Sequence, residues 1–575
     1  MTRDGSLIKF YAVSVFFFGF VSGAWGSEPY QDYRKRIESS QNLTALSDTL
    51  FGESISLYNG KTEFSATDID LPGNSSLPVR LQRRFNVEMS LTGTASSFNA
   101  SLNGAGGWDV DVPYITGTFQ GDGWRADRCS GHFVPSVGAP FSYIEVWQGN
   151  TIHIPGASDR TMLALESSTP RPTDGVVRKW TSNQRDAIDC IPMISGIPGE
   201  GYRVTTTAGD KYYFNVSVSK YAGTLSKSIG MPMPSTVSRN RIYLLATKVE
   251  DRFGNVVNYE YDALGHPTRI WANDGREINV TYSGGNIASA TANGRSWTYS
   301  YTTVEGQVRL LSVSQPDGGR WGFNYSNALS PPYVVWDGSS TSDCAEQPNP
   351  IPLEFVLSIT HPSGATGKFT FSNSRHWRSG VHMSSCNQRI SNSPFGSTYY
   401  YELDTPNFFD VMTLYEKSIA GPGIATPLKW TYQYGGGVQY LWGSRSAAAI
   451  YPCTTCPAEK EVLVTNPDRT KTRYRYGFLY ALNDGRLLGS TVLTATGAVL
   501  KTTDTTFMTT AEVDGQPFAP RFGLIYNGDD PSTAQVRPVV RSTVQQHGMT
   551  LVTTNNAFDT YARPVSTTES SSPTP

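Results

Sequence analysis

Three pairs of closely spaced carboxylates are the first residues of this 575-residue chain that could do chemistry. They are Asp68/Asp70, Asp109/Asp111 and Asp186/Asp189. On a β-strand, an i, i+2 pair puts both carboxylates on one face, where they could serve a glycosidase or hold a cation. Acidic loops are common, however, and no cluster has the ligand density of a calcium loop. We therefore expect no catalytic residue, no metal ligand and no cofactor.

The spacing of the histidines is not typical of a metal site either. Seven are scattered along the chain, at His132, His153, His266, His361, His376, His382 and His547. We expect them at surface or turn positions. The sequence also contains no Gly-x-Ser-x-Gly nucleophile elbow and no phosphate-binding loop.

Tryptophan is the remaining side chain with binding potential, because its ring can stack on a sugar. Seven residues qualify: Trp108, Trp124, Trp147, Trp180, Trp271, Trp297 and Trp321. The alternative, which we favour, is that these rings fill the faces of sheets.

Six cysteines are present, at positions 129, 190, 344, 386, 453 and 456. An even number in an exported chain indicates disulfides, and pairing of neighbours is the simplest of the possible arrangements. That arrangement is Cys129–Cys190, Cys344–Cys386 and Cys453–Cys456. The Cys-Thr-Thr-Cys motif at 453–456 could also be a redox or zinc motif, but neither a βαβ setting nor a second ligand pair accompanies it.

Export itself is predicted by the N-terminus. Arg3 and Lys9 precede an apolar run over 10–21, and Ala24 and Gly26 are small residues at −3 and −1 of a cut before Ser27. This order is typical of a secretory signal, and the run is shorter than the ~20 residues of a membrane span. An uncleaved anchor is the alternative. We expect a secreted, cell-surface or periplasmic protein with no transmembrane segment after cleavage.

The net charge of −2 excludes a basic surface for phosphates, so no nucleic-acid partner is expected. Charged residues make up 17% of the chain and aromatic residues 12%, and there are 54 glycines. Tyrosine and threonine suit half-buried pleated surfaces and glycine suits tight turns, so the composition favours an all-β protein.

A repeated spacing then defines the expected architecture. A turn glycine is followed by apolar residues, mostly aromatic, five and seven positions later. Five positions earlier stands a β-branched apolar residue in five of the six main copies, the exception being Ser289. This register holds at Gly254, Gly275, Gly294, Gly318 and Gly364, with Arg469 in the glycine position of a later copy and a weaker copy at Gly209. The +5 and +7 side chains share one face of a strand, so each unit is a strand, a turn and a strand with one apolar stripe. Because a single hairpin is marginally stable, we expect the units to stack into an array.

One of these units resembles a known family. The segment Tyr259-Glu-Tyr261-Asp262-Ala-Leu-Gly265 is similar to the YD-repeat pattern of the RHS family, and Phe558-Asp559-Thr-Tyr-Ala562 looks like a divergent copy. The stretches 52–73 and 107–113 resemble the region that precedes the repeats in bacterial RHS proteins. The resemblance implies hairpins that wrap into a shell, but neither a self-cleavage core nor a C-terminal toxin is recognisable.

We therefore predict an all-β fold of tandem β-hairpin repeats in an extended, curved antiparallel sheet, preceded by an irregular β-rich domain. The expected parts are a signal peptide (1–26), a polar lead with a possible short helix (27–49), the irregular domain (50–240), RHS/YD-type repeats (241–330), divergent repeats with inserted loops and cysteines (331–460), further divergent repeats (461–565) and a disordered tail (566–575).

The resulting functional hypothesis is a non-catalytic, exported scaffold component of an RHS-type system for surface contact, competition or toxin delivery. A carbohydrate- or surface-binding β-repeat protein is the alternative, and a secreted hydrolase is a third possibility. Expected partners are a downstream RHS polypeptide or a second copy, paired through C-terminal strand edges near 541–554, and surface glycans.

Overall fold

A computed structural model describes most of residues 49–574. The residues left out in this range are 88–100, 132, 140, 142, 148, 167–168, 170–172, 228–234, 330–352, 394–395, 404, 406, 436–440, 445, 447–452, 481, 522 and 524–534. The predicted signal peptide and nearly all of the polar lead, together with Cys344 and His132, lie outside the described residues. Residues 51–575 form one compact unit, and everything below concerns it. No helix in the described parts is both long and apolar enough for a bilayer span.

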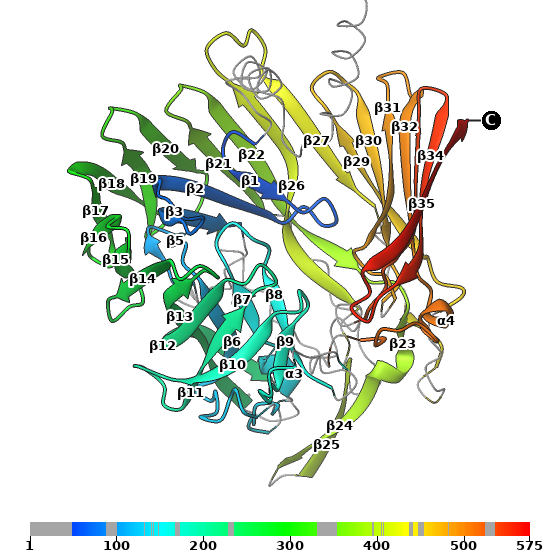
Figure 1. The fold of residues 1–575 in the computed structure, drawn as a ribbon, viewed down its shortest axis with the longest axis horizontal. Helices are drawn as coiled ribbons and strands as arrows, with labels where there is room; N and C mark the ends of the chain where they lie inside the picture. The colour runs from blue at the N-terminus through cyan, green and yellow to red at the C-terminus, as the bar shows by residue number, and fades with distance from the viewer. Residues whose placement is uncertain are drawn as a thin grey trace, which may run out of the picture. The chain divides into compact units, whose positions relative to one another are not determined.

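The unit is built almost entirely of β-strands, 26 of which belong to one sheet among the described residues. From β10 to β22 each strand pairs antiparallel with the next in the chain, and the same order continues through β26, β27 and β29 to β35 (Figure 1). The predicted all-β fold with an extended antiparallel repeat sheet is confirmed.

The strands of the array have the following bounds. The first half comprises β10 (Ala187–Pro192), β11 (Glu200–Thr205), β12 (Lys211–Lys227), β13 (Ser235–Glu250), β14 (Val256–Tyr261), β15 (Pro267–Ala272), β16 (Glu277–Ser283), β17 (Asn286–Ala292), β18 (Arg295–Val304), β19 (Gln307–Ser314), β20 (Arg320–Tyr325), β21 (Glu354–Thr360) and β22 (Thr366–Trp377). The second half comprises β26 (Phe408–Ala420), β27 (Leu428–Tyr434), β29 (Glu459–Thr465), β30 (Lys471–Gly477), β31 (Leu487–Leu493), β32 (Val499–Phe507), β33 (Val539–Gln546), β34 (Met549–Phe558) and β35 (Pro564–Pro573).

Pairing within the array follows the register expected from the sequence. The +5 aromatic residue of one unit lies opposite the −5 aliphatic residue of the next, as in Tyr259 with Ile270, Tyr299 with Val313 and Phe323 with Ile359. On each strand the +5 and +7 rings share a face, and those of Tyr259 and Tyr261 stack with centroids 6.3 Å apart. Alternating aromatic and β-branched cross-strand pairs are an effective way to stabilise a sheet face.

A β-bulge recurs opposite the +7 aromatic residue of the units. The following strand carries one extra residue opposite Tyr261, Tyr282, Tyr301, Phe371 and Tyr476. Bulges bend a strand and increase its twist, so one bulge in most of the units explains how the strands curve round an interior (Figure 1). Three of these tyrosines also donate their hydroxyl to a backbone carbonyl of an earlier strand, at 2.7–2.9 Å.

The turns confirm the role of the repeat glycines. Gly275 and Gly294 have φ of 91° and 72°. Only the second belongs to a two-residue hairpin turn in which both residues, Asn293 and Gly294, have positive φ. Arg469, which replaces the glycine in its copy, adopts φ of 67°, a conformation that is strained for a side-chain-bearing residue.

The divergent last copy also keeps the turn of the first. The N–H of Asp262 donates to His266 and that of Asp559 donates to Arg563, while Ala562 takes φ of 57° in the place of Gly265. The tail expected to be disordered over 566–575 instead lies largely in β35. The reason is that its serine and threonine residues can continue a ladder with β34, which runs from Met549↔Pro573 to Phe558↔Pro564.

The expected irregular domain is divided between two sheets. A separate five-stranded sheet is formed by β1 (Glu53–Ile55), β2 (Thr62–Leu71), β3 (Val79–Asn86), β4 (Gly104–Ala105) and β5 (Trp108–Val110). A second group joins the array: β6 (Tyr114–Gln120), β7 (Thr151–His153), β8 (Arg160–Ala164) and β9 (Trp180–Ser182). The long strand β13 is the branch point, because its Arg239–Leu245 segment pairs with β6 and its last residues pair with β14.

The five-stranded sheet crosses the inside of the curved array (Figure 1). Phe64 packs edge-on against Phe369 of β22, Phe85 contacts Tyr325 of β20, and Trp108 donates its indole N–H to the Tyr325 hydroxyl at 2.8 Å. The aromatic stripe of the repeats is therefore covered by the chain's own N-terminal strands.

The remaining elements are short and lie at the margins of the array. They are the parallel pair β23 (Val381–His382) and β28 (Leu441–Trp442), the hairpin β24 (Cys386–Ser393) and β25 (Gly396–Leu403), the 3-10 turn η1 (Met383–Ser385), and the helices α3 (Tyr143–Val146) and α4 (Thr510–Val513).

Candidate functional site

The three carboxylate pairs have different fates in the structure. Asp68 is buried in an ion pair with Arg83, while Asp70 is exposed, because a bulge between Thr67 and Ile69 turns the second half of β2 over. The i, i+2 rule therefore fails for this pair.

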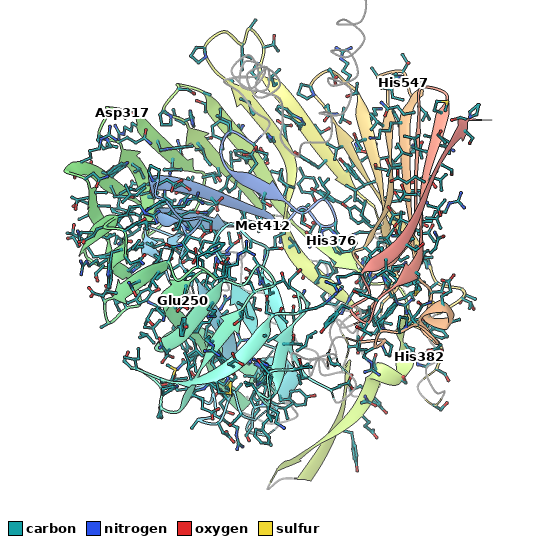
Figure 2. All side chains as sticks on the ribbon, in the orientation of Figure 1. Glu250, Asp317, His376, His382, Met412 and His547 are labelled. Atoms are coloured by element: carbon teal, nitrogen blue, oxygen red, sulfur yellow. A yellow bond between two sulfur atoms is a disulfide. The ribbon has the colours of Figure 1, made fainter. Side chains whose placement is uncertain are left out.

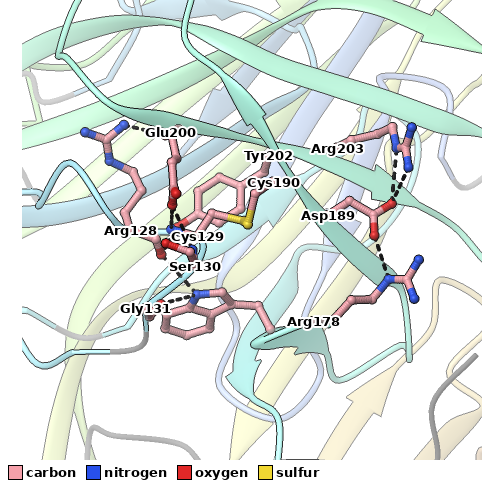
Figure 3. Close-up of a disulfide and its surroundings, with 11 residues drawn as sticks. Arg128, Cys129, Ser130, Gly131, Arg178, Asp189, Cys190, Glu200, Tyr202 and Arg203 are labelled. Carbon is pink, nitrogen blue, oxygen red and sulfur yellow. Dashed lines mark hydrogen bonds and ion pairs between the residues drawn. A yellow bond between two sulfur atoms is a disulfide. The ribbon is translucent and has the colours of Figure 1, made fainter. Parts of the chain in front are cut away.

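Asp186 and Asp189 are likewise separated into two structural ion pairs. Asp186 accepts a hydrogen bond from Arg160, and Asp189 lies between Arg178 and Arg203 (Figure 3). Both carboxylates are neutralised by arginines, and neither lies in a cavity with the other.

Asp109 and Asp111 do share a face, and they line a cavity of about 760 Å³. Its wall is assembled from the five-stranded sheet, from β6, β7 and β13, and from β19 of the repeats. Strand alternation explains this wall: Gln82, Arg84 and Asn86 point into the cavity, whereas Arg83 points the other way, against the ring of Phe323.

Arg84 is the centre of the cavity's polar floor and only 5% of the residue is exposed. Its Nη1 donates to Glu63 Oε2 at 3.3 Å, its Nη2 donates to the Tyr114 hydroxyl, and its Nε lies 3.9 Å from Asp111 Oδ1. A buried guanidinium is tolerated only when it is paired and hydrogen-bonded in this way.

His153 extends this floor towards solvent. Its Nε2 lies 2.6 Å from Asp111 Oδ1 and its Nδ1 lies 2.6 Å from Asp159 Oδ1. A neutral imidazole has only one N–H, so donating to both carboxylates requires the imidazolium form. Burial alone would lower the pKa of His153, but the hydrogen bonds to Asp111 and Asp159 outweigh it and raise that pKa above its ordinary value.

The carboxylates of the wall are perturbed in turn. Burial raises the pKa of Asp109, although Arg84 and the backbone N–H of Asn103 oppose the shift. Burial also raises the pKa of Glu63 against the effect of Arg84. For Asp159, burial is outweighed by His153, and the pKa of this carboxyl is lowered. The cavity thus holds acids with different proton affinities within one network.

The histidines were expected at surface or turn positions, and this is wrong for three of the six that the structure describes, His153, His376 and His382, which are buried in strands. His266 is also buried but lies in the turn that Asp262 begins, and His361 and His547 lie in turns as well. Figure 2 shows His376 in the interior and His547 at a hairpin tip. Burial lowers the pKa of His376 to about 4. Its Nε2 lies 3.3 Å from the Ser374 hydroxyl and 3.1 Å from the Thr413 hydroxyl. These side chains are buried because their strands have two covered faces, which alternation alone does not reveal.

The tryptophans fill sheet faces, as favoured. Six of the seven candidates are buried, namely Trp108, Trp124, Trp147, Trp180, Trp297 and Trp321. Trp271 is half-buried beneath Arg269, whose guanidinium carbon lies 4.4 Å from the ring centroid. Sugar stacking on an exposed tryptophan therefore has no support from these residues.

Two of the predicted disulfides are confirmed, Cys129–Cys190 and Cys453–Cys456. Cys386 is also in a disulfide, but its expected partner, Cys344, lies outside the described residues. Beside the first disulfide, Glu200 accepts hydrogen bonds from the backbone N–H groups of Cys129 and Ser130 (Figure 3). Cys129, Cys190 and Glu200 are residue types that bind metals, but the two sulfurs are bonded to each other and are not thiolates.

Sequence reasoning identified only Asp109 and Asp111 of this cavity as candidates. It missed Glu63, Arg84 and His153, although the adjacent Arg83 and Arg84 between Leu81 and Phe85 indicate that one face of the strand is neither core nor solvent. No signal in the sequence alone joins His153 to Asp111, because they are brought together only by the pairing of β6 with β7.

Comparisons with known proteins add little to this description. No family model and no curated protein matches the sequence. Among solved structures, the crystal structure of TcdB2-TccC3-TEV aligns with 71% of this chain and 23% of its own chain, at 11% identity and a TM-score of 0.15. The aligned part is less than a quarter of that chain, and a likeness at this score carries no argument.

Proposed function

We propose that the protein is an exported, non-catalytic scaffold component of an RHS-type system, whose repeat sheet is extended at its C-terminal edge by another strand. The observation that carries the proposal is β35. All of its residues are exposed, one edge is paired with β34, and no described strand pairs with the other edge.

The position of β35 within its repeat supports an incoming strand. It follows the Asp559 turn as β15 follows the Asp262 turn, and β15 has β16 on its far side. An unpaired edge presents a row of N–H and C=O groups that a further strand satisfies. The structure moves this edge from the 541–554 segment named in the sequence analysis to Pro564–Pro573, because β33 and β34 are paired on both sides.

The strand that we assign to this edge is β35 of a second copy. In an antiparallel pair centred between Thr568 and Glu569, each Glu569 faces Thr568 of the other chain, so no like charges meet. Glu569 is the only charged residue of the strand, so little charge repulsion opposes edge-to-edge pairing.

Two features support the remaining parts of the proposal. The disulfides Cys129–Cys190 and Cys453–Cys456 suit an oxidising compartment, in agreement with the predicted signal peptide. The His153 imidazolium, in turn, is already held between Asp111 and Asp159, which leaves it no free basic nitrogen for general-base catalysis.

The test is the oligomeric state of the mature chain, measured by light scattering after size exclusion. We expect a concentration-dependent dimer at micromolar protein, lost on deletion of 564–575 and on the double substitution Val565→Lys with Ser571→Lys. Lysines at Thr496 and Ala498, in the exposed turn between β31 and β32, are the matched control and should leave the dimer intact. A monomer that is unchanged by the deletion contradicts the proposal.

A further inference from the structure

The cavity around Arg84 has the size and construction of a ligand site. Its volume of about 760 Å³ lies within the range of roughly 300–1,000 Å³ that is usual for small-molecule pockets. Its floor is buried, since Asp111, Tyr114 and His153 are each at most 7% exposed. Its rim is exposed at Lys61 and at the loop 156–159, which is where the cavity reaches solvent.

The charges of the wall come close to balancing. The acidic lining residues are Glu63, Asp109, Asp111 and Asp159, the permanently cationic ones are Lys61, Arg84, Arg241 and Arg309, and the imidazolium of His153 adds one further positive charge. Arg84 is paired with Glu63 and Asp111, and His153 with Asp111 and Asp159, so positive and negative groups alternate over the floor. Because the single excess positive charge is spread over groups that are already paired, the cavity provides only a weak net field, and a charged ligand would be desolvated there without a dedicated counter-charge.

The same wall is rich in directional donors and acceptors. Each carboxylate has about four acceptor sites and each guanidinium has five donors, and the hydrogen bonds of Arg84 to Glu63 and Tyr114 use only part of its five. Gln82, Asn86 and Ser65 add neutral amide and hydroxyl groups, and Phe85 and Tyr243 add apolar ring surface. A ring with an apolar face matches this pattern when it carries neighbouring hydroxyl groups, because each hydroxyl can both donate and accept a hydrogen bond.

Stability alone does not account for such a wall. Buried ion pairs are often no better than apolar residues of similar volume, because their desolvation offsets their attraction. The Nε of Arg84 is buried with no hydrogen-bond acceptor, which adds to the cost.

We propose that this cavity binds a neutral saccharide of one or two rings, with Arg84, Asp109 and Asp111 contacting its hydroxyl groups and the loop 156–159 forming the entrance. The site is separate from the β35 edge and does not depend on the oligomeric state. It also differs from stacking on exposed tryptophans, because the residues that contact the ligand are charged and lie inside the protein.

The experiment uses the full mature chain and measures saturation-transfer NMR and calorimetric binding with N-acetylglucosamine, galactose and maltose as neutral probes. Glucuronate and glucosamine are their charged counterparts. We expect at least one neutral probe to bind with a Kd of roughly 1 mM or tighter, and the charged probes to bind at least about tenfold more weakly.

The decisive variant is Ala157→Trp, which places a large ring at the exposed rim without altering the buried floor. It should weaken binding at least about tenfold while the melting temperature stays unchanged. Ala263→Trp, in an exposed hairpin turn outside the cavity, is the matched control and should bind like the wild type. Absence of binding by every neutral probe, tighter binding of a charged probe, or binding that Ala157→Trp does not affect each overturns the proposal.

Discussion

At the scale of single residues, the unusual feature is how many charged side chains the interior holds. Arg83 and Arg84 are adjacent on β3, yet they serve opposite faces. Arg83 forms a buried pair with Asp68 and lies over the rings of Trp108 and Phe323, and Arg84 organises the cavity floor. Alternation along a strand makes this possible, since neighbouring side chains never share a face.

The charged state of His153 predicts a pH dependence of stability. Its folded-state pKa lies above the ordinary value near 6.5, so the stabilisation by Asp111 and Asp159 is full below that value and is lost as pH rises through the folded pKa. Arg84 also faces this ring and opposes the shift. We expect His153→Gln to lower the free energy of unfolding by about 1–3 kcal/mol at pH 5.5 and by less at pH 9.

Denaturant unfolding of both proteins at the two pH values measures this difference. His547→Asn, at an exposed hairpin tip where asparagine tolerates the positive φ of 53°, is the control, and its effect should not vary with pH. A His153→Gln effect that is larger at pH 9 would mean that the imidazole is neutral in the folded protein.

At the scale of elements, the hairpin unit consists of a turn, an aromatic pair and a bulge. The first two follow from residue types, since glycine accepts positive φ and aromatic residues two apart share a face. The bulge opposite the +7 aromatic residue has no consistent residue type: the extra residue is Thr268, Ala288, Leu311, Tyr415 or Leu488. It is therefore set by the geometry of packing the ring and not by the inserted side chain.

The turns give a prediction at this scale. Gly294 has open space around the position of a Cβ atom, so the penalty for Gly294→Val comes from its backbone φ of 72° and not from a clash. We expect a loss of about 1–2 kcal/mol. The conservative change Ser300→Thr on the following strand should cost far less. Conversely, Arg469→Gly relieves a residue at φ of 67° and should stabilise the protein or leave it unchanged. Equal melting temperatures for Gly294→Val and Ser300→Thr would contradict the turn assignment.

At the scale of the whole molecule, the array and the N-terminal sheet depend on each other. The inner aromatic stripe needs a partner surface, and the strands before the repeats supply it through Phe64, Phe85 and Trp108. Long-range links reinforce this arrangement, among them the buried ion pair between Glu53 and Lys417 at 2.7 Å. Isolated repeats without residues 51–112 would therefore expose this stripe.

The two described disulfides should differ in their effect on stability. Cys129–Cys190 spans 61 residues and Cys453–Cys456 only three. In the loop-entropy model, closing the longer loop stabilises by about 4 kcal/mol and closing the shorter one by about 1.5 kcal/mol. The urea midpoint should fall more for the double serine variant of the first pair than for that of the second. The reverse order would show that the short loop stabilises the fold by another route.

The sequence by itself determined the all-β class, the hairpin register, the turn positions and two of the disulfides. These depend on local rules: period-two alternation, positive φ at glycine, and pairing of neighbouring cysteines. It did not determine which face of each strand is covered: β3 is buried on both faces although it contains Gln82, Arg83 and Arg84, and alternation along the sequence does not show this. Nor could it show that Asp111, His153 and Arg84 meet, since their contacts arise from pairing between strands that are distant in the chain. Tertiary structure alone decided that the N-terminal strands fill the inside of the array, because covering its aromatic stripe is favourable only after the repeats have curved round them.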